Sequence, residues 1–371
     1  MKIEGRCACG AALVWDDGGR PAPIGHATCA ACGAERVLSR FEKMDVALSE
    51  QCNYRCVMCR RPQDDARLER DDVIGVMTQA RELGLKCVSF CGGEPFVHPD
   101  FVEICEAAIG LGLKVQLTTN GSLVTAAALE RLQGLDCLTV SIDGLEATHD
   151  RIRGVPGAFS RAVEALRLAA RCGITHGTNT VIQRQNALEI LPLFERLLEE
   201  TGGRIDYVRH APVEVTPELV HLMVSGDEVE VVQAQLREVA RRCEERGIYF
   251  SHRSQLLDHL PLFLDKWTRH RPAGGCMIPR KFIGYSHLGF YLCWHQGRSL
   301  RAPSLLEALR TTVAQEVVTE AAEGRCVGCN ALTYSWDEEW NRGILEGKLV
   351  SDGRLVDGVT TVCGDWDDDR R

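Results

Sequence analysis

Short apolar runs alternate with longer amphipathic stretches between about residues 44 and 250. The apolar runs have the composition of buried strands and occupy residues 44–49, 86–91, 114–119, 137–142, 176–182 and 205–210. The amphipathic stretches have helical periodicity, and examples lie at residues 71–84, 99–112, 125–134, 160–173 and 187–203. Six strands alternating with helices predict a parallel sheet with right-handed crossovers. We therefore expect an α/β fold, a full or partial (β/α)6 TIM-like barrel whose site lies at the carboxyl ends of the strands.

The first 40 residues have a different pattern, with two cysteine knuckles, "RCACG" and "TCAACG", on either side of a loop. Each knuckle places two thiolates on a tight turn that ends in glycine, and the four together suit a tetrahedral metal ion. The ligands of this expected structural zinc ribbon are Cys7, Cys9, Cys29 and Cys32. A rubredoxin-like iron site is the alternative, and His26 could in principle replace one ligand.

The strand and helix alternation stops after residue 250. Residues 274–297 read as a hairpin bracketed by Cys276 and Cys293, and residues 304–310 and 312–324 read as helices. The pair Cys326 and Cys329 follows, and Cys363 lies in an acidic tail. The chain thus divides into three expected units, residues 1–40, 41–250 and 251–371.

Composition and charge narrow the function classes. A net charge of −9 argues against nucleic acid as the main partner, because phosphate binding needs a basic face. The chain has no apolar run of about 18 residues and no apolar stretch at its start, so we expect neither a membrane span nor an export signal. We expect a cytoplasmic protein whose 18 cysteines serve mainly metal or cluster binding, with the isolated ones packed as small core or surface residues. The isolated cysteines are Cys87, Cys105, Cys137, Cys172 and Cys243.

The segment "CNYRCVMC" places Cys52, Cys56 and Cys59 on the loop after the first expected barrel strand. A structural zinc site would need a fourth protein ligand. A four-iron cluster held by three thiolates instead keeps one iron without a protein ligand, free to bind another molecule. The triplet therefore predicts a cluster with an open coordination position at the mouth of the barrel.

This CxxxCxxC motif after the first strand of an α/β barrel resembles the radical S-adenosylmethionine (SAM) superfamily. In that family the open iron chelates the amino and carboxylate groups of SAM, whose reductive cleavage yields a 5'-deoxyadenosyl radical. The segment "CGGEP" after the second strand matches the family element that holds the SAM amino group, although an ordinary strand-to-helix turn would read similarly. The matching residues are Gly92, Gly93, Glu94 and Pro95.

The resemblance continues through "TTNG" at the end of the third strand and "SIDGLEATHDRIRG" at the end of the fourth. It implies that Ser141 and Arg153 contact the SAM carboxylate and that Asn179 faces the ribose, although a strand asparagine can equally satisfy backbone groups. Met58 stands where the family often has an aromatic residue, and its main chain is expected near the adenine.

The C-terminal cysteines resemble the twitch version of the family's auxiliary-cluster domain. The implied ligands of one extra 4Fe-4S cluster are Cys276, Cys293, Cys326 and Cys329. A zinc ion held by the same four thiolates is the structural alternative. With all sites filled, we expect two 4Fe-4S clusters and one zinc, or about eight irons per chain.

Hydrogen abstraction from a substrate carbon is the expected reaction, with epimerisation or dehydrogenation as its outcome. Cys363 and Cys91 are candidate hydrogen donors for epimerisation. The polar residues expected near the mouth are Arg209, His210, Lys281, Tyr285, His287 and His295. They favour a hydroxylated or anionic small molecule of the sugar or aminocyclitol type as the substrate. A peptide maturase is the alternative, and an electron-transfer or binding protein without SAM chemistry is the alternative from another class. The resemblance also implies a low-potential electron donor, a flavodoxin or ferredoxin.

Overall fold

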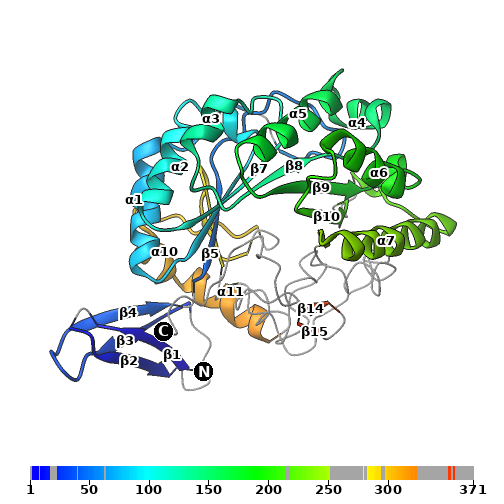
Figure 1. Cartoon of the computed structure of the whole chain (residues 1–371). Coiled ribbons are helices and arrows are strands. Elements are labelled where there is room, and N and C mark those ends of the chain that lie inside the picture. The colour runs from blue at the N-terminus through cyan, green and yellow to red at the C-terminus, as the bar shows by residue number, and fades with distance from the viewer. Residues whose placement is uncertain are drawn as a thin grey trace.

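The computed structural model describes residues 2–7, 9–16, 23–39, 41–61, 64–213, 218–250, 279, 282–293 and 297–323, together with two short strands at 350–351 and 354–355 (Figure 1). Its centre is a parallel sheet in which strands that follow one another in sequence lie side by side. These strands are β5 (Lys43–Ala47), β6 (Cys87–Cys91), β7 (Lys114–Thr119), β8 (Cys137–Ser141), β9 (His176–Ile182) and β10 (Tyr207–Pro212). All six predicted strands and their parallel arrangement are confirmed.

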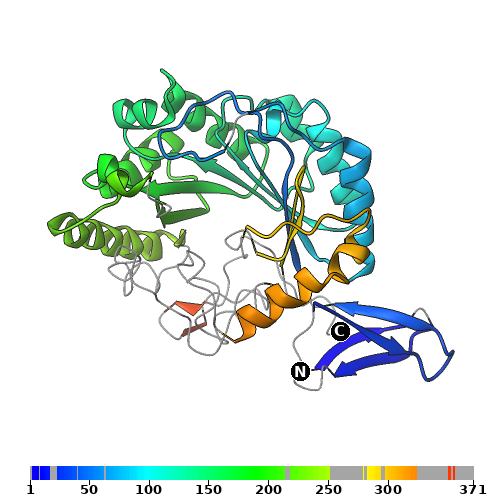
Figure 2. The same ribbon diagram turned by 180° about the vertical axis from the view of Figure 1, so that it is seen from behind.

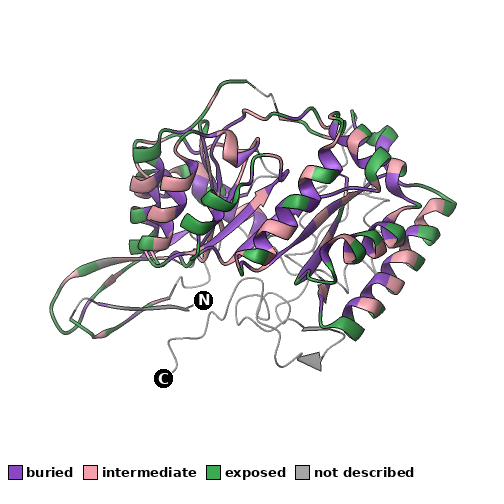
Figure 3. Ribbon diagram, turned by 45° about the horizontal axis from the view of Figure 1, so that its top comes forward, coloured by how far each residue is buried: buried purple, intermediate pink, exposed green. Residues whose placement is uncertain are grey.

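Helices cover the outside of this sheet, which curves into a partial barrel (Figure 1). The predicted helices form as α1 (Arg70–Glu82), α2 (Phe101–Gly110), α3 (Ala126–Arg131), α5 (Ala158–Arg171) and α6 (Ile190–Thr201). Figure 3 shows their buried faces turned toward the strands and their exposed faces turned outward. In α5, for example, Phe159, Ala162, Val163 and Leu166 are buried at helical spacing.

Further elements extend the pattern. Helix α4 (Glu146–Arg153) follows β8, and α7 (Asp227–Arg246) leads to a short strand, β11 (Tyr249–Phe250), which pairs in parallel with β10. Single 3-10 turns lie at η1 (Pro95–Val97), η2 (Arg184–Asn186) and η3 (Val220–Leu222).

The predicted hairpin in the C-terminal part forms as β12 (Phe282–Ser286) and β13 (Gly289–Tyr291). Strand β12 also pairs in parallel with β5, so the hairpin enlarges the barrel sheet, which runs in the order β11-β10-β9-β8-β7-β6-β5-β12-β13. Helices α10 (Leu305–Leu309) and α11 (Thr312–Ala322) confirm the two predicted there, and β14 (Val350–Ser351) pairs with β15 (Arg354–Leu355).

Two antiparallel hairpins form the N-terminal segment, β1 (Lys2–Arg6) with β2 (Ala12–Asp16) and β3 (Ile24–Thr28) with β4 (Glu35–Ser39). Ile24 belongs to the main hydrophobic core, and the Ser39 hydroxyl donates to the Leu83 carbonyl at 2.5 Å. Figure 2 shows this segment at the end of the barrel where β5 begins, away from the loop that follows β5. The predicted boundaries at residues 40 and 250 stay predictions.

Of the isolated cysteines, Cys87, Cys105, Cys137 and Cys243 are buried, as expected of core residues, and Cys172 is partly buried. No helix in the described part of the chain is long and apolar enough to cross a membrane.

Candidate functional site

A cavity of about 250 Å³ lies at the carboxyl ends of β5 to β8. Its wall combines Cys52, Cys56 and Cys59 with Cys91, Glu94 and Arg153. Of the other predicted site residues, Met58, Gly92, Gly93 and Ser141 also line the cavity, whereas Pro95 and Asn179 do not. Pro95 is buried at the start of η1, and Asn179 lies in β9 opposite Ser141.

The loop that carries the three cysteines is closed at its base. The Leu68 amide donates to the Leu48 carbonyl at 2.8 Å, and the Glu50 amide donates to the Ala66 carbonyl at 2.8 Å. Both ends of this segment, residues 48–68, are therefore held together next to β5. We call this segment the triplet loop.

Within the triplet loop, Tyr54 is an internal anchor. Its side chain is 2% exposed, and its hydroxyl accepts a hydrogen bond from Arg161 Nε at 3.1 Å. The Tyr54 amide donates to Cys52 Sγ at 3.4 Å, which holds that sulfur in place. Burial raises the pKa of the Cys52 and Cys56 thiols, so an electropositive group at this site is needed to keep them as thiolates.

The donor set fits a cluster better than a single ion. Among the residues that the structure describes, the one group of three or more metal-ligand side chains close enough for a single ion is in the N-terminal segment. Cys52, Cys56 and Cys59 surround a shared cavity without converging on one point. Such spacing suits thiolates that bind three different irons of a cluster.

The glycine pair at the end of β6 packs against the triplet loop. A Cβ on Gly93 would lie 1.8 Å from the Gln51 carbonyl oxygen, so only glycine fits there. The Gly93 amide donates to the Ser49 carbonyl at 2.7 Å, and the Glu94 amide donates to the Gln51 carbonyl at 2.9 Å. Glycine lets two backbone segments approach closely, and the segment that approaches this pair is the triplet loop.

Glu94 is 1% exposed and presents a buried carboxylate to the cavity. Its Oε1 accepts from the Thr119 hydroxyl at 2.7 Å and from the Phe96 amide at 3.2 Å, and its Oε2 accepts from the Asn120 amide at 2.7 Å. Burial raises the pKa of the Glu94 carboxyl, and these hydrogen bonds oppose the rise by stabilising the anion. A carboxylate offers about four acceptor positions, so a position remains for a donor from a ligand.

Arg153, the last residue of α4, also lines the cavity, with 8% of its surface exposed. Its Nε forms an ion pair with Asp143 Oδ2 at 2.7 Å, and its Nη1 donates to Cys56 Sγ at 3.8 Å. Burial alone would lower the pKa of Arg153, but the Asp143 carboxylate reverses this and raises it. The guanidinium is therefore a fixed positive charge beside a predicted cluster ligand.

Comparison with known proteins agrees with this geometry. The sequence profile of the Radical SAM superfamily matches residues 46–197, which run from within β5 to within α6 and include every cavity residue named above. Residues 46–197 form a radical SAM domain.

Curated relatives and solved structures are also similar to this chain. The chain is 35% identical over 163 residues to an AdoMet-dependent heme synthase of Methanosarcina barkeri, covering 42% of this chain and 46% of that protein. It is 37% identical over 166 residues to a PqqA peptide cyclase of Gluconobacter oxydans, covering 43% and 46%. The match thus spans about half the length of these curated relatives. The SuiB structure of Streptococcus suis with SAM bound gives a TM-score of 0.59 at 17% identity over 77% of this chain and 68% of that one, which supports the fold.

Two asparagines of the radical SAM domain were missed in the sequence. Asn120 of the "TTNG" segment donates through Nδ2 to Asn53 Oδ1 at 2.9 Å, and Asn53 donates through Nδ2 to the Ser122 hydroxyl at 2.8 Å. These bonds join the end of β7 to the triplet loop. The signal in the sequence was an asparagine inside each of two motifs that the fold places side by side.

The other polar residues predicted at the mouth, where the structure describes them, make contacts with other parts of the protein. His210 is buried and stacked on Phe250 with ring centroids 5.3 Å apart, and burial lowers its pKa to about 4. Tyr285 stacks on Phe290 in the β12–β13 hairpin. His287, in the turn of this hairpin, lies 3.6 Å from the carboxylate of Glu50 at the base of the triplet loop. Arg209 lies in β10 away from the cavity lining, and Lys281 and His295 lie outside the described residues.

Of the predicted auxiliary ligands, Cys293 lies within the described residues. Cys293 is buried just after β13, and Cys276, Cys326, Cys329 and the candidate donor Cys363 lie outside the described residues. The second candidate donor, Cys91, lines the cavity at the end of β6.

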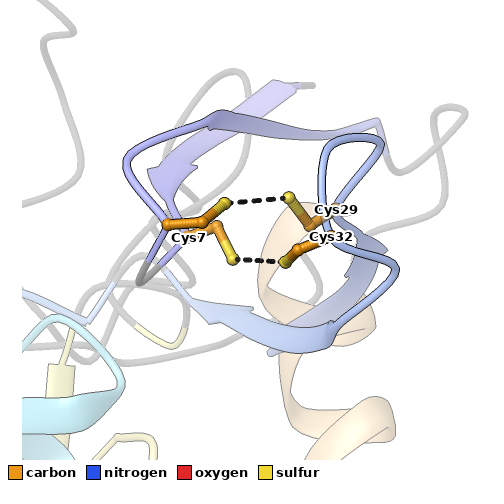
Figure 4. Close-up of side chains that lie close together, drawn as sticks. Cys7, Cys29 and Cys32 are labelled. Carbon is orange, nitrogen blue, oxygen red and sulfur yellow. Dashed lines mark hydrogen bonds between the residues drawn. The ribbon is translucent and has the colours of Figure 1, made fainter.

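The four N-terminal cysteines converge on one point (Figure 4). Their sulfurs all lie within 4.8 Å of one another, and the pairs Cys7–Cys32 and Cys9–Cys29 are both 3.5 Å apart. Each knuckle is the turn of a hairpin, so the two hairpins contribute two ligands each. Hydrogen bonds from backbone amides lower the pKa of Cys7 and of Cys29, which favours their thiolates, whereas the neighbouring thiols raise the pKa of Cys32.

Proposed function

We propose that this chain is a radical SAM enzyme that reductively cleaves SAM and uses the resulting 5'-deoxyadenosyl radical to abstract hydrogen from a substrate. The observation that carries this is a single cavity lined by the three thiols of the triplet loop, a buried carboxylate and a buried guanidinium. Three thiols hold a cluster with one open iron, and the two charges are suited to an amino acid.

The charges suit the methionine part of SAM. Glu94 has an acceptor position left for the ammonium group, and Arg153 offers N–H donors to the carboxylate. Ser141, 9% exposed in the cavity wall, adds a hydroxyl. We propose that Glu94, Arg153 and Ser141 orient SAM in this way, with the ribose near Asn179 and the adenine near the main chain of Met58.

The 4Fe-4S cluster would supply the electron for cleavage and coordinate the amino acid group of SAM. The residues of the chain supply position and shielding. Tyr54 and the base of the triplet loop fix the thiols, and Met58 closes one side of the cavity by packing on the apolar cluster of Val213, Leu219, Leu222 and Met223. Such exclusion of water protects a carbon radical from side reactions.

The direct test is SAM cleavage. We expect anaerobically reconstituted protein to produce 5'-deoxyadenosine when SAM and dithionite are added. The matched variant Cys56→Ser should produce none. Cluster-loaded protein that leaves SAM intact would refute the enzyme function and favour an electron-transfer or binding role.

For the substrate, we propose a hydroxylated small molecule of the sugar or aminocyclitol type. Polar groups on the cavity wall beyond the proposed SAM contacts support this, namely Arg61, Thr118 and Asn120. For the outcome, epimerisation requires a thiol that returns hydrogen to the opposite face of the substrate carbon. Cys91 lies in the cavity wall, and burial raises its pKa to about 12, so it keeps its S–H at neutral pH. The sulfur radical left on Cys91 would be reduced, with uptake of a proton, by the low-potential flavodoxin or ferredoxin that serves the cluster.

Solvent isotope distinguishes the outcomes. In D2O, epimerisation through a thiol places one deuterium on the substrate carbon, whereas dehydrogenation leaves the product two hydrogens lighter without deuterium at that carbon. Cys91→Ala should convert epimerisation into uncoupled SAM cleavage. Full epimerisation by Cys91→Ala would exclude this donor and leave Cys363 as the candidate.

Peptide modification is the second candidate function, and the relatives named PqqA peptide cyclase favour it. The two candidates are separated by adding either a panel of cyclitols and amino sugars or synthetic peptides encoded next to this gene, and measuring which accelerates 5'-deoxyadenosine formation. Acceleration by a peptide alone would replace the small-molecule proposal.

For the metals, we propose that Cys7, Cys9, Cys29 and Cys32 bind one structural zinc and that Cys276, Cys293, Cys326 and Cys329 bind an auxiliary 4Fe-4S cluster. Sulfurs around tetrahedral zinc lie about 3.8 Å apart, close to the 3.5 Å of the two sulfur pairs in the N-terminal site. Elemental analysis should give about eight irons and one zinc per chain. About four irons would exclude the auxiliary cluster, and a second zinc would point to a zinc ion in its place.

A further inference from the structure

A buried ion pair joins Arg153, which lines the cavity, to Asp143, which does not. Asp143 is 0% exposed and Arg153 is 8% exposed, so both charges have lost most of their water. A buried pair repays its desolvation cost only in part, which makes it weak as a purely stabilising device. Its position beside a predicted cluster ligand points to a role in the site.

Asp143 is itself held firmly in place. Its Oδ1 accepts from the Val181 amide of β9 at 2.9 Å, and its own amide donates to His149 Nδ1 of α4 at 2.9 Å. Its carbonyl oxygen accepts from Asn186 Nδ2 in η2. Three separate elements thus fix this one residue, and its free oxygen, Oδ2, is directed at Arg153.

Arg153 in turn is held at both ends of its guanidinium. Nε is paired with Asp143 at 2.7 Å, and Nη1 donates to Cys56 Sγ at 3.8 Å. The third nitrogen, Nη2, has no partner among the described residues, and Arg153 lines the cavity. The planar guanidinium can therefore span an acid, a sulfur and a ligand at once, which a point charge cannot do.

We propose that Asp143 is a positioning residue that fixes Arg153 between Cys56 and the cavity, and thereby sets both the affinity for SAM and the reduction potential of its cluster. This inference rests on the proposed function. A hydrogen bond to a cluster sulfur stabilises the reduced, more negative state and raises the potential. Without Asp143, the guanidinium is free to rotate away from the sulfur, so both effects should disappear together.

The experiment compares wild type with Asp143→Asn and with a matched control, Asp136→Asn. Asp136 is a partly buried aspartate that accepts from the Val115 amide at 2.6 Å, and it lies at the amino end of β8, opposite the cavity. For each reconstituted protein, the dissociation constant for SAM is measured by calorimetry. The midpoint potential of the SAM-responsive cluster is measured by EPR-monitored titration.

We expect Asp143→Asn to weaken SAM binding by about tenfold or more and to lower the midpoint potential, with Asp136→Asn unchanged in both. The sign of the potential shift is decisive. Removing a negative charge from a fixed site would raise the potential, so a rise, or unchanged affinity and potential, would overturn the positioning role.

A second variant covers the case in which Asp143→Asn does not fold. Arg153→Lys keeps the charge opposite Asp143 but replaces the planar fork by a single ammonium group. It should also weaken SAM binding and lower the potential, and normal values for both would overturn the proposal. Failure of the proposed function would look different, because wild type itself would then not cleave SAM.

Discussion

Gly93 offers a sharp test of how the triplet loop is supported. In Gly93→Ala the new Cβ would meet the Gln51 carbonyl oxygen at 1.8 Å and the carbonyl carbon at 2.5 Å. Both are backbone atoms, so no side chain can move aside, and β6 and the triplet loop must separate by more than about 1 Å.

The free-energy cost of this separation has two parts. The first is the rupture of the Gly93-to-Ser49 and Glu94-to-Gln51 backbone hydrogen bonds, worth about 0.5–1.5 kcal/mol each. The second is overpacking, which adds about 1–3 kcal/mol. The sum, about 2–6 kcal/mol, is comparable with a large part of the stability of a typical domain, but the loop can relieve it by local displacement.

We therefore expect Gly93→Ala to remain folded by circular dichroism, to unfold at lower urea concentration, and to lose iron at the triplet together with SAM cleavage. Gly75→Ala is the matched control. It lies within α1, nothing stands within 4 Å of its added Cβ, and alanine should stabilise the helix by up to about 1 kcal/mol. If Gly93→Ala loaded iron and cleaved SAM like wild type, with the same urea midpoint, the glycine pair would not support the loop as argued.

Three further predictions concern separate parts of the chain. Burial raises the pKa of the Glu94 carboxyl, so the protonated group stabilises the SAM-free protein at low pH, and this stabilisation is lost as pH rises through that pKa. SAM binding needs the Glu94 anion, so the affinity for SAM should increase as pH rises through the same range. Calorimetric titration with SAM across about pH 5–8 should show an affinity that increases with pH in wild type and a weaker, pH-independent affinity in Glu94→Gln. The same pH dependence in both proteins would contradict the role of Glu94 in binding SAM. Cys29→Ser should lose the zinc by elemental analysis and lower the melting temperature, while SAM cleavage at room temperature continues; zinc retained in full would remove Cys29 from the ligands. Thr125→Ala removes the hydroxyl that accepts from the Ala128 amide at the start of α3, so urea unfolding should show a loss of about 1 kcal/mol without any change in SAM affinity.

The barrel could be predicted because its strands are short, apolar and regularly separated by helices. Elements that depend on tertiary contacts have a weaker signal in the sequence. Helix α4 is mainly polar, and part of its stability comes from Glu189, which accepts from the Leu145 amide and the Thr148 hydroxyl from 41 or more residues away. Strand β11 has only two residues and forms by pairing with β10.

The candidate site shows the same division. Cys52 and Glu94 stand in contiguous motifs, so their types and spacing indicate their chemistry. Asp143 stands in another motif, "SIDGLEATHDRIRG", but its role depends on where Arg153 points, which only the fold determines. The Asn53–Asn120 bond likewise joins residues 67 positions apart, and only the fold shows that their two motifs lie side by side.

The long reach of these contacts has a consequence for synthesis of the protein in the cell. Cys56 accepts a hydrogen bond from Arg153, which lies 97 residues later in the chain, and Tyr54 accepts one from Arg161, which lies 107 residues later. At ordinary rates of translation, the triplet loop must wait about 5–20 seconds after its own synthesis before those partners emerge from the ribosome. During that interval its three thiols are part of an unfinished barrel, so the cellular machinery that inserts iron and sulfide should meet a completed cavity only once the fourth strand and the two helices after it are in place.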